Sequence, residues 1–152
     1  MIMFSTVFAG EMIDYSVDED ICRFSDYLDT QNNLPYIRVS GGRMEIDTDV
    51  LKAGIAFANG NIEVKENMEN VQILTAADTI RVNGSIENAL LLAPSVIIDG
   101  EVNGTVVILS TSVSLGENSN VKGDILACTP NFKTAGKITG NVILVAENVT
   151  VS

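Results

Sequence analysis

Apolar and polar residues alternate along the second half of the chain in a sequence motif that recurs. In its first occurrence Ile80, Val82 and Ile86 alternate with polar residues around Gly84. Later repeats start at residues 96, 113, 132 and 149, so consecutive starts are 16, 17, 19 and 17 residues apart. Alternation with a period of two, carried mostly by Val, Ile and Leu, is typical of β-strands rather than helices. A short and nearly constant repeat length predicts a solenoid.

Turn residues keep their chemistry from one repeat to the next. A small polar residue precedes each repeat start, namely Asn61, Thr79, Ser95, Ser112, Asn131 and Asn148. Pro94 and Pro130 stand one position earlier in the same column. Glycines form two further columns, at 84, 100 and 136 and at 104, 123 and 140, where bends favour a residue without a Cβ. One strand-and-turn unit per repeat, stacked on its neighbours, predicts a parallel β-helix.

The same periodicity begins in weaker form at Met44. Apolar residues recur every 18 positions as Met44, Ile62 and Ile80; as Ile46, Val64 and Val82; as Val50, Met68 and Ile86; and, on a third side, as Ile55, Ile73 and Leu91. Three apolar sides favour a roughly triangular coil with short strands. We therefore predict an all-β fold, a single-stranded parallel β-helix of about six triangular coils over residues 44–152, with residues 1–43 as a separate N-terminal segment.

Charged residues fall into outward columns in this register. One column contains Glu45, Glu63 and Arg81, and another contains Asp47, Lys65 and Asn83. We expect Glu63 to pair with Arg81, and Asp47 with Lys65, across neighbouring coils. Each exposed pair contributes only a fraction of a kcal/mol, so these pairs select the register more than they stabilise the fold.

The N-terminal segment is predicted to be an irregular cap that contains a short helix. Ile21, Phe24 and Leu28 have helical spacing, and Asp20 suits the N-cap. Such a helix would cover the open end of the solenoid. Tyr36–Val39 has the character of a strand that pairs with the first full coil, and Gly41-Gly42 predicts a break.

Residues 1–10 are apolar and uncharged. Three interpretations stay open: the end of a secretory signal cleaved after Val7-Phe8-Ala9, a hydrophobic foot that docks on a membrane or a neighbouring chain, and a first strand. The stretch is short for a secretory signal and lacks a basic start.

Charge excludes several classes of partner. The formal net charge is −11, with 9 basic and 20 acidic residues, so the surface repels nucleic acid and anionic membranes. No apolar run has the length of a membrane-spanning helix. For Cys22 and Cys128 we favour two buried free thiols, with a disulfide as the alternative.

Candidate catalytic chemistry is sparse. The chain has no His, so general acid–base catalysis would depend on Asp, Glu, Lys or Tyr. The nearest approach to a metal site is Asp47-x-Asp49, which is more typical of a solvated strand edge, and no phosphate-binding loop is present. We therefore predict a protein that is not an enzyme, without catalytic residues, metal or cofactor.

The Val-x-Gly-x-Ile motif is similar to a motif of a known protein family. It occurs as Val102-Asn103-Gly104-Thr105-Val106, as Val121-Lys122-Gly123-Asp124-Ile125 and as Ile138-Thr139-Gly140-Asn141-Val142. With repeats near 17 residues, the chain resembles the bactofilins, the polymer-forming cytoskeletal proteins of bacteria, over about residues 44–152. The resemblance implies a right-handed triangular β-helix that polymerises end to end without nucleotide and attaches to the membrane through a short N-terminal segment. The acidic residues 11–43 depart from that family's Pro-rich tails.

We therefore expect a non-enzymatic structural protein that associates with itself through the ends of its β-helix. The expected contact residues lie in the last coil and the beginning of the next, namely Phe132, Ile138, Val142, Val149 and Val151. The resemblance implies a cytoskeletal or envelope scaffold at the bacterial cell envelope, associated with the membrane or cell wall, with either face of the membrane left open. The alternative is an extracytoplasmic β-helix module that binds polysaccharide or protein.

Overall fold

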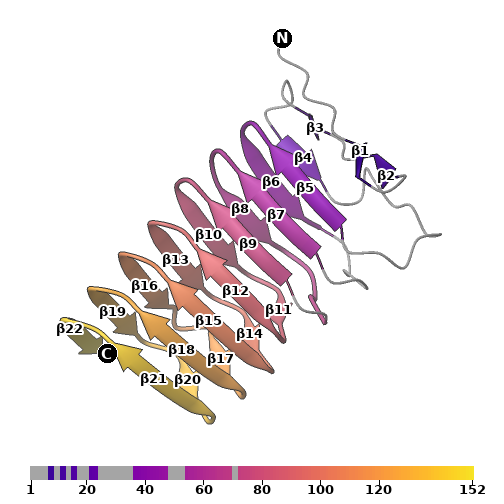
Figure 1. The fold of residues 1–152 in the computed structure, drawn as a ribbon. Helices are drawn as coiled ribbons and strands as arrows, with labels where there is room; N and C mark the ends of the chain where they lie inside the picture. Colours follow the sequence, from indigo (N-terminus) through magenta and orange to yellow (C-terminus); the bar gives the residue numbers. More distant parts are fainter. Residues whose placement is uncertain are drawn as a thin grey trace.

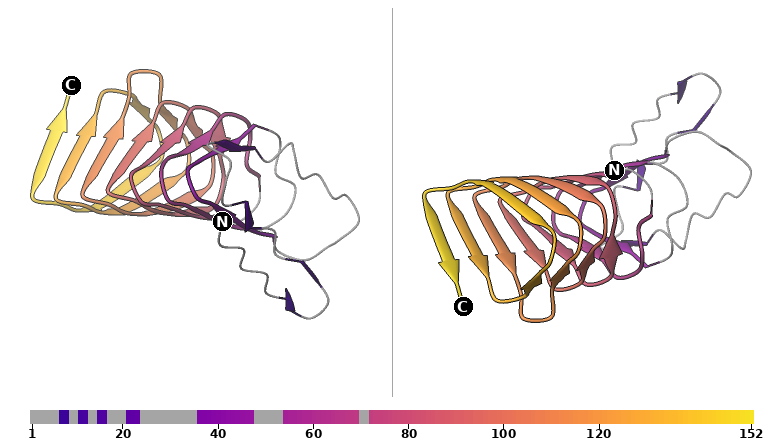
Figure 2. Two further views of the ribbon diagram at one scale, coloured as in Figure 1. Left: turned by 90° about the horizontal axis from the view of Figure 1, so that it is seen from above. Right: turned by 90° about the horizontal axis from the view of Figure 1, so that it is seen from below.

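A computed structural model describes residues 7–8, 11–12, 15–16, 21–23, 36–47, 54–69 and 72–152. In these residues the chain winds into a solenoid of about six turns, and every regular element is a β-strand, so the predicted β-helix is confirmed. Figure 1 shows the turns stacked in sequence order, from the N-terminal strands to the C-terminal coil. Views from above and below show the same single row of coils (Figure 2).

Three parallel sheets form the sides of the solenoid. Sheet 1 contains eight strands, listed from the N-terminus: β4 (Ile21–Arg23), β6 (Arg43–Ile46), β8 (Ile62–Val64), β10 (Thr79–Val82), β13 (Ser95–Ile98), β16 (Ser112–Leu115), β19 (Asn131–Thr134) and β22 (Asn148–Val151). Sheet 2 also contains eight: β3 (Tyr15–Ser16), β5 (Tyr36–Ser40), β7 (Gly54–Ala58), β9 (Gln72–Ala76), β12 (Ala89–Leu92), β15 (Thr105–Leu109), β18 (Asp124–Cys128) and β21 (Asn141–Val145). Sheet 3 contains four: β11 (Ser85–Ile86), β14 (Glu101–Val102), β17 (Asn120–Val121) and β20 (Lys137–Ile138). Outside these sheets, β1 (Val7–Phe8) pairs with β2 (Glu11–Met12) in antiparallel orientation.

The predicted register of sheet 1 is confirmed. Ile80 pairs with Val96, Val96 with Val113, Val113 with Phe132, and Phe132 with Val149. The small polar residues that precede these positions form a column of their own, in which Asn148 Nδ2 donates a hydrogen bond to Asn131 Oδ1 at 3.1 Å. The two extra residues of the longest repeat are accommodated in a turn at 116–119, which is closed by a 3.0 Å hydrogen bond from Ser119 N to Gly116 O.

The core fills the inside of the solenoid. In sheet 3, Ile86, Val102 and Val121 form the predicted inward stack and are inaccessible to solvent, and Ile138 continues it. Each inward side chain therefore contacts the coils above and below it, so that the turns stabilise one another.

One side of the predicted register was wrong. Ile73 pairs with Leu90, whereas Leu91 pairs with Leu74 and points inward. The inward column that contains Leu91 consists of Ala56, Leu74, Leu91, Ile108 and Ala127. The error of one residue arises at Ala89–Leu92. These four residues are all apolar, so the sequence does not show which of them point inward and which outward. Val50, which was assigned to another column, lies outside the described residues.

The outer surface of sheet 2 carries two adjacent apolar columns, which we call the apolar face. Its first column contains Ile55, Ile73, Leu90, Val107, Leu126 and Ile143. Its second column contains Phe57, Thr75, Leu92, Leu109, Cys128 and Val145. These side chains are half-buried or exposed, whereas those between the columns are buried in the described strands before the last coil. The apolar face therefore runs along the solenoid from β7 to β21.

The predicted helix over residues 21–28 is also wrong where the structure describes it. Ile21–Arg23 is strand β4, which pairs in parallel with Arg43–Glu45 of β6. These residues therefore add one more strand to sheet 1. Asp20 and residues 24–28 lie outside the described residues. The predicted strand at Tyr36–Val39 is confirmed as part of β5, and Gly41-Gly42 forms a bend. Parallel pairing continues before residue 44, as far as Tyr15–Ser16. Most of residues 1–10 lie outside the described residues.

The glycine corners are required by close approach between coils. A Cβ built on Gly100 would lie 1.8 Å from the carbonyl oxygen of Gly84 in the preceding coil. A Cβ on Gly123 would lie 2.0 Å from the oxygen of Gly104. Real Cβ atoms do not approach backbone oxygens so closely, so these corners exclude any other residue at the observed coil spacing.

Candidate functional site

The terminal coil is the first candidate site, because it forms the last strand of each of the three parallel sheets. Strands β20, β21 and β22 each pair with only one neighbouring strand among the described residues. Each strand therefore presents a row of backbone N–H and C=O groups on its outer edge. Such a row is a template for pairing with another strand.

Four of the five predicted contact residues lie on this coil, and they continue inward columns of the coil below. Ile138 pairs with Val121, and Val142 with Ile125, both of which are inaccessible to solvent. Val149 and Val151 continue the sheet 1 columns and are 55% and 77% exposed. The terminal coil thus exposes side chains that are buried in every earlier full coil.

Phe132 takes a different position from the other four. It belongs to β19, one coil below, pairs with Val149 and is only 3% exposed. Its ring therefore supports the contact residues from beneath, and the structure does not place it on the exposed surface.

Sequence reasoning missed two residues of this site. Leu144 and Ala146 pack against the core from the terminal coil. Leu144 pairs with Ala127 and so extends the inward column that includes Ile108 and Leu91. The position of Leu144 in that apolar column could have identified it as an inward residue. It was missed because the predicted phase of sheet 2 was wrong by one residue. Beneath Val151, Thr134 is buried and its hydroxyl oxygen has no hydrogen-bond partner.

A cluster of charges lies at the opposite end of sheet 1. The carboxylate of Glu45, which is 4% exposed, receives three cations: Arg23 Nε at 3.2 Å, Arg43 Nη2 at 3.0 Å and Lys65 Nζ at 2.9 Å. Arg43 also contacts Glu63. The hydrogen bond from Lys65 lowers the pKa of Glu45, burial opposes it, and Arg23 lowers the pKa further. This cluster attaches β4 to the first full coils.

The expected outward column of Glu45, Glu63 and Arg81 is confirmed, but its charges pair differently. Arg81 Nη1 lies 2.9 Å from Asp99 Oδ2, and Glu63 pairs with Arg43. The long side chains reach diagonally, so that a shared column does not decide the partner.

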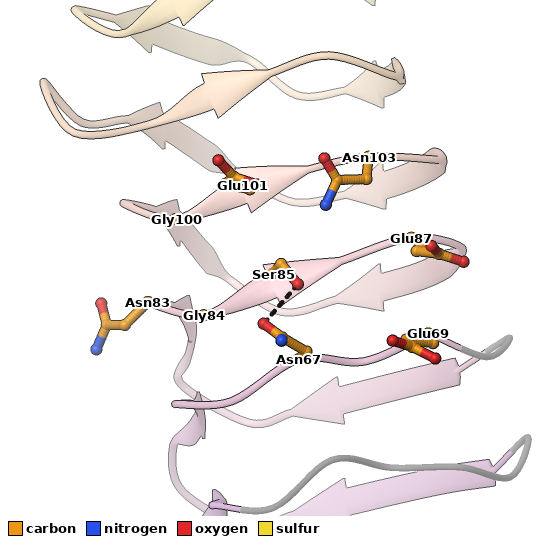
Figure 3. A pocket seen from close by; sticks show the side chains of 9 residues that line it. All are labelled: Asn67, Glu69, Asn83, Gly84, Ser85, Glu87, Gly100, Glu101 and Asn103. Atoms are coloured by element: carbon orange, nitrogen blue, oxygen red, sulfur yellow. Dashed lines mark hydrogen bonds between the residues drawn. The ribbon is translucent and has the colours of Figure 1, made fainter.

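A shallow polar groove on sheet 3 is the second candidate site. Figure 3 shows it between successive coils, with Asn67, Glu69, Ser85, Glu87 and Glu101 among its lining residues. Ser85 Oγ donates a 2.7 Å hydrogen bond to Asn67 Oδ1. Lys122 Nζ approaches Glu101 Oε2 at 2.9 Å and lowers the pKa of that carboxyl. Amide and carboxylate groups of this kind bind hydroxyl-rich ligands, but they supply no nucleophile with an adjacent base.

The described residues contain no group of three or more His, Cys, Asp or Glu side chains arranged to hold a metal ion. Asp47 is described and Asp49 is not. The prediction that both cysteines are buried was wrong for Cys128, which is a free and exposed thiol at the end of β18. It lies in an outward column of sheet 2, which was not recognised in the sequence. The side chain of Cys22 lies outside the described structure.

No helix among the described residues has the length and apolarity needed to cross a membrane. Comparisons with family models, with curated proteins and with solved structures find no match to this chain. The fold and the geometry of the sites therefore carry the functional argument alone.

Proposed function

We propose that this chain is a non-enzymatic structural protein, bactofilin-like in its architecture, that associates with itself through the ends of its β-helix. The observation that carries the proposal is the terminal coil. Its three edge strands and its inward columns, including Ile138, Val149 and Val151, are exposed together. A second terminal coil placed on this surface would satisfy backbone groups and bury apolar side chains at the same time.

The symmetry of the contact decides the product. Contact between two terminal coils gives a closed dimer, whereas contact between the terminal coil and the N-terminal end of another copy gives a filament. At the N-terminal end the outermost described strands, β3 and β4, have only two and three residues, and the charges around Glu45 lie beside β4. This difference between the two ends favours the closed dimer. In either form the product suits a scaffold at the cell envelope.

The test compares neighbouring residues on β22. Val149→Asp and Val151→Asp place a carboxylate in the contact, whereas Thr150→Asp places the same charge on the outer side of the same strand. We expect sedimentation velocity and negative-stain microscopy to show dimers or filaments for the unmodified chain and for Thr150→Asp. The two valine variants should have lost the end contact. An unmodified chain without such a contact at high micromolar concentration contradicts the proposal.

A second candidate function is a binding module for polysaccharide. The observation that favours it is the polar groove, where Asn67, Ser85 and Glu101 present hydrogen-bonding groups on successive coils. Regular spacing along the solenoid would match a polymer with repeated hydroxyl groups. Shifts of groove amide signals on titration with soluble glycans would support this function, and no shift with any glycan would reject it.

A further inference from the structure

The apolar face is a feature that association through the ends does not use. Leu109 is 46% exposed and Leu126 is 38% exposed, although neither lies on an edge strand of sheet 2. No charged side chain interrupts its two columns among the described strands from β7 to β21. Contiguous apolar surface with a polar rim is typical of an interaction site.

We propose that the apolar face binds the same face of a second copy of this chain, so that two solenoids pack side by side. The contact is lateral and is separate from the end contact of the proposed function. Its two halves are identical surfaces related by a two-fold axis. The outer layers of the two sheets then pack as the two sheets of a β-sandwich do, about 10 Å apart.

The area of the face fits this partner. Six strands at a spacing of about 4.8 Å, each about five residues long at about 3.3 Å per residue, cover a rectangle of about 29 Å by 16 Å. Two such faces in contact bury on the order of 1,000 Å² in total, which is the size at which specific association begins. If copies also joined end to end, the face would continue from one copy to the next and the lateral contact would strengthen.

Charge restricts which surfaces of two copies can meet. The chain carries a net charge of −11, and carboxylates such as Glu63 and Glu101 lie on the outer surfaces of sheets 1 and 3. Contact through those surfaces would bring like charges together, whereas the columns of the apolar face are uncharged. An anionic membrane would repel the rest of the molecule.

Shape gives the same result. Each column of the face repeats at the spacing of the coils, so the same face of a second copy carries side chains at the same spacing along its whole length. A partner without this spacing would match the face only locally. A second copy is therefore the occupant that the geometry fits best.

The experiment separates the lateral contact from the end contact. In a Val151→Asp background, which removes the end contact, we expect sedimentation velocity to show a dimer that forms with increasing concentration. Adding Leu109→Lys and Leu126→Lys should then give a monomer. The matched control adds Asn103→Lys and Thr139→Lys, which change the net charge equally at exposed positions around sheet 3, and it should leave the dimer intact.

Cys128 supplies a second readout because it lies in the face between Leu109 and Val145. With Cys22→Ser added to the Val151→Asp background, so that one thiol remains and the end contact is removed, alkylation of Cys128 by a maleimide should slow several-fold as the dimer forms. A folded Leu109→Lys, Leu126→Lys variant should react at one rate at all concentrations. This readout does not depend on the mass of the complex.

Three results would overturn the inference. The Val151→Asp chain could stay monomeric up to several hundred micromolar with constant alkylation of Cys128. Its dimer could survive the two lysines in the face. Vesicles of zwitterionic phosphatidylcholine could protect Cys128 when a second copy does not, which would make a lipid surface the occupant. Failure of the end contact alone, with the lateral dimer retained, would reject the proposed function and leave this inference standing.

Discussion

Sheet 1 and sheet 2 have eight strands each and line the same core, yet their outer surfaces differ in chemistry. Outward positions of sheet 1 carry charges such as Glu45, Glu63 and Arg81. Outward positions of sheet 2 carry Ile, Leu and Val on almost every coil, and each side chain there remains at least partly accessible.

The comparison separates what folding requires of the inward residues from what it requires of the outward residues. Folding of the solenoid requires apolar residues inside, and both sheets supply them. An apolar exterior contributes little to the fold of a single chain and lowers its solubility, so it needs another explanation. The polar exterior of sheet 1 needs none. Function in this fold therefore has to be sought in the outward columns and at the ends.

The largest loss of stability is expected at the glycine corners, because the spacing of the coils in all three sheets depends on them. Gly100 forms the corner between β13 of sheet 1 and β14 of sheet 3, where a Cβ would lie 1.8 Å from the Gly84 oxygen. We expect Gly100→Val to lower the free energy of unfolding in urea by roughly 3–5 kcal/mol, because two coils must separate. Gly60→Ala is the matched control, since its Cβ would meet Gly42 O at 3.0 Å and should have a smaller effect. Equal stability of Gly100→Val and the unmodified chain would contradict the observed coil spacing.

The next prediction tests whether the two sheets differ only on the outside. Ile98 of sheet 1 and Ile108 of sheet 2 are both inaccessible to solvent. Replacing either by Ala should cost about 3 kcal/mol of unfolding free energy, through lost burial and a residual cavity. Leu109→Ala, one residue further along β15, should cost less than about 0.5 kcal/mol in the monomer because its side chain points outward.

A reversed order would break the comparison. If Leu109→Ala destabilised the monomer more than Ile108→Ala did, the inward and outward columns of sheet 2 would be exchanged. The apolar face would then be core, and no exposed surface would remain to explain.

The same two sheets show how far the sequence alone could reach. In sheet 1 polar and apolar residues alternate, as at Ile80-Arg81-Val82, so the phase and the register could be predicted and are confirmed. In sheet 2, Ala89–Leu92 and Asn141–Val145 contain continuous apolar runs, which fit either phase. The apolar face was missed for the same reason, because a residue inside such a run is assigned to the core by default.

Two other misses have local causes. The spacing of Ile21, Phe24 and Leu28 fits a helix, but pairing with Arg43–Glu45 and the contact from Arg23 to Glu45 place Ile21–Arg23 in a strand. Tertiary pairing of this kind overrides local propensity. The exposed terminal coil could be predicted because its columns continue a repeat that was already phased, whereas the pairing of individual charges depends on the reach of flexible side chains.

A smaller effect is expected from the charges that the outward columns of sheet 1 carry and the apolar face lacks. Glu45→Gln keeps the shape of the side chain but leaves Arg23, Arg43 and Lys65 without their shared carboxylate. We expect it to lower the unfolding free energy by about 1–3 kcal/mol at neutral pH. Glu147→Gln, at an exposed position, is the control and should have no measurable effect.

The pH dependence of this variant has a defined sign. Hydrogen bonding to Lys65 lowers the pKa of Glu45 in the folded chain relative to the unfolded chain. The contribution of ionised Glu45 is therefore fully present above its unfolded pKa and is lost as the pH falls through its folded pKa. Urea titrations of both proteins should differ at neutral pH and converge in acid. A gap that stays constant into acid would show that the carboxylate charge is not the cause.

The smallest effect is expected from the ion pair on sheet 3, which compares an exposed carboxylate with the buried one. Glu101 and Lys122 meet at 2.9 Å, but their side chains are 44% and 49% exposed, and solvent screens their attraction. We expect Lys122→Met, which retains the apolar part of the side chain, to leave the melting temperature unchanged within error. An NMR titration should nevertheless show the pKa of Glu101 rising toward its ordinary value, because the hydrogen bond from Lys122 is the main cause that lowers it. A loss of stability as large as that of Glu45→Gln would mean that burial does not decide the strength of these pairs, and the charges of sheets 1 and 3 would then have to be treated alike.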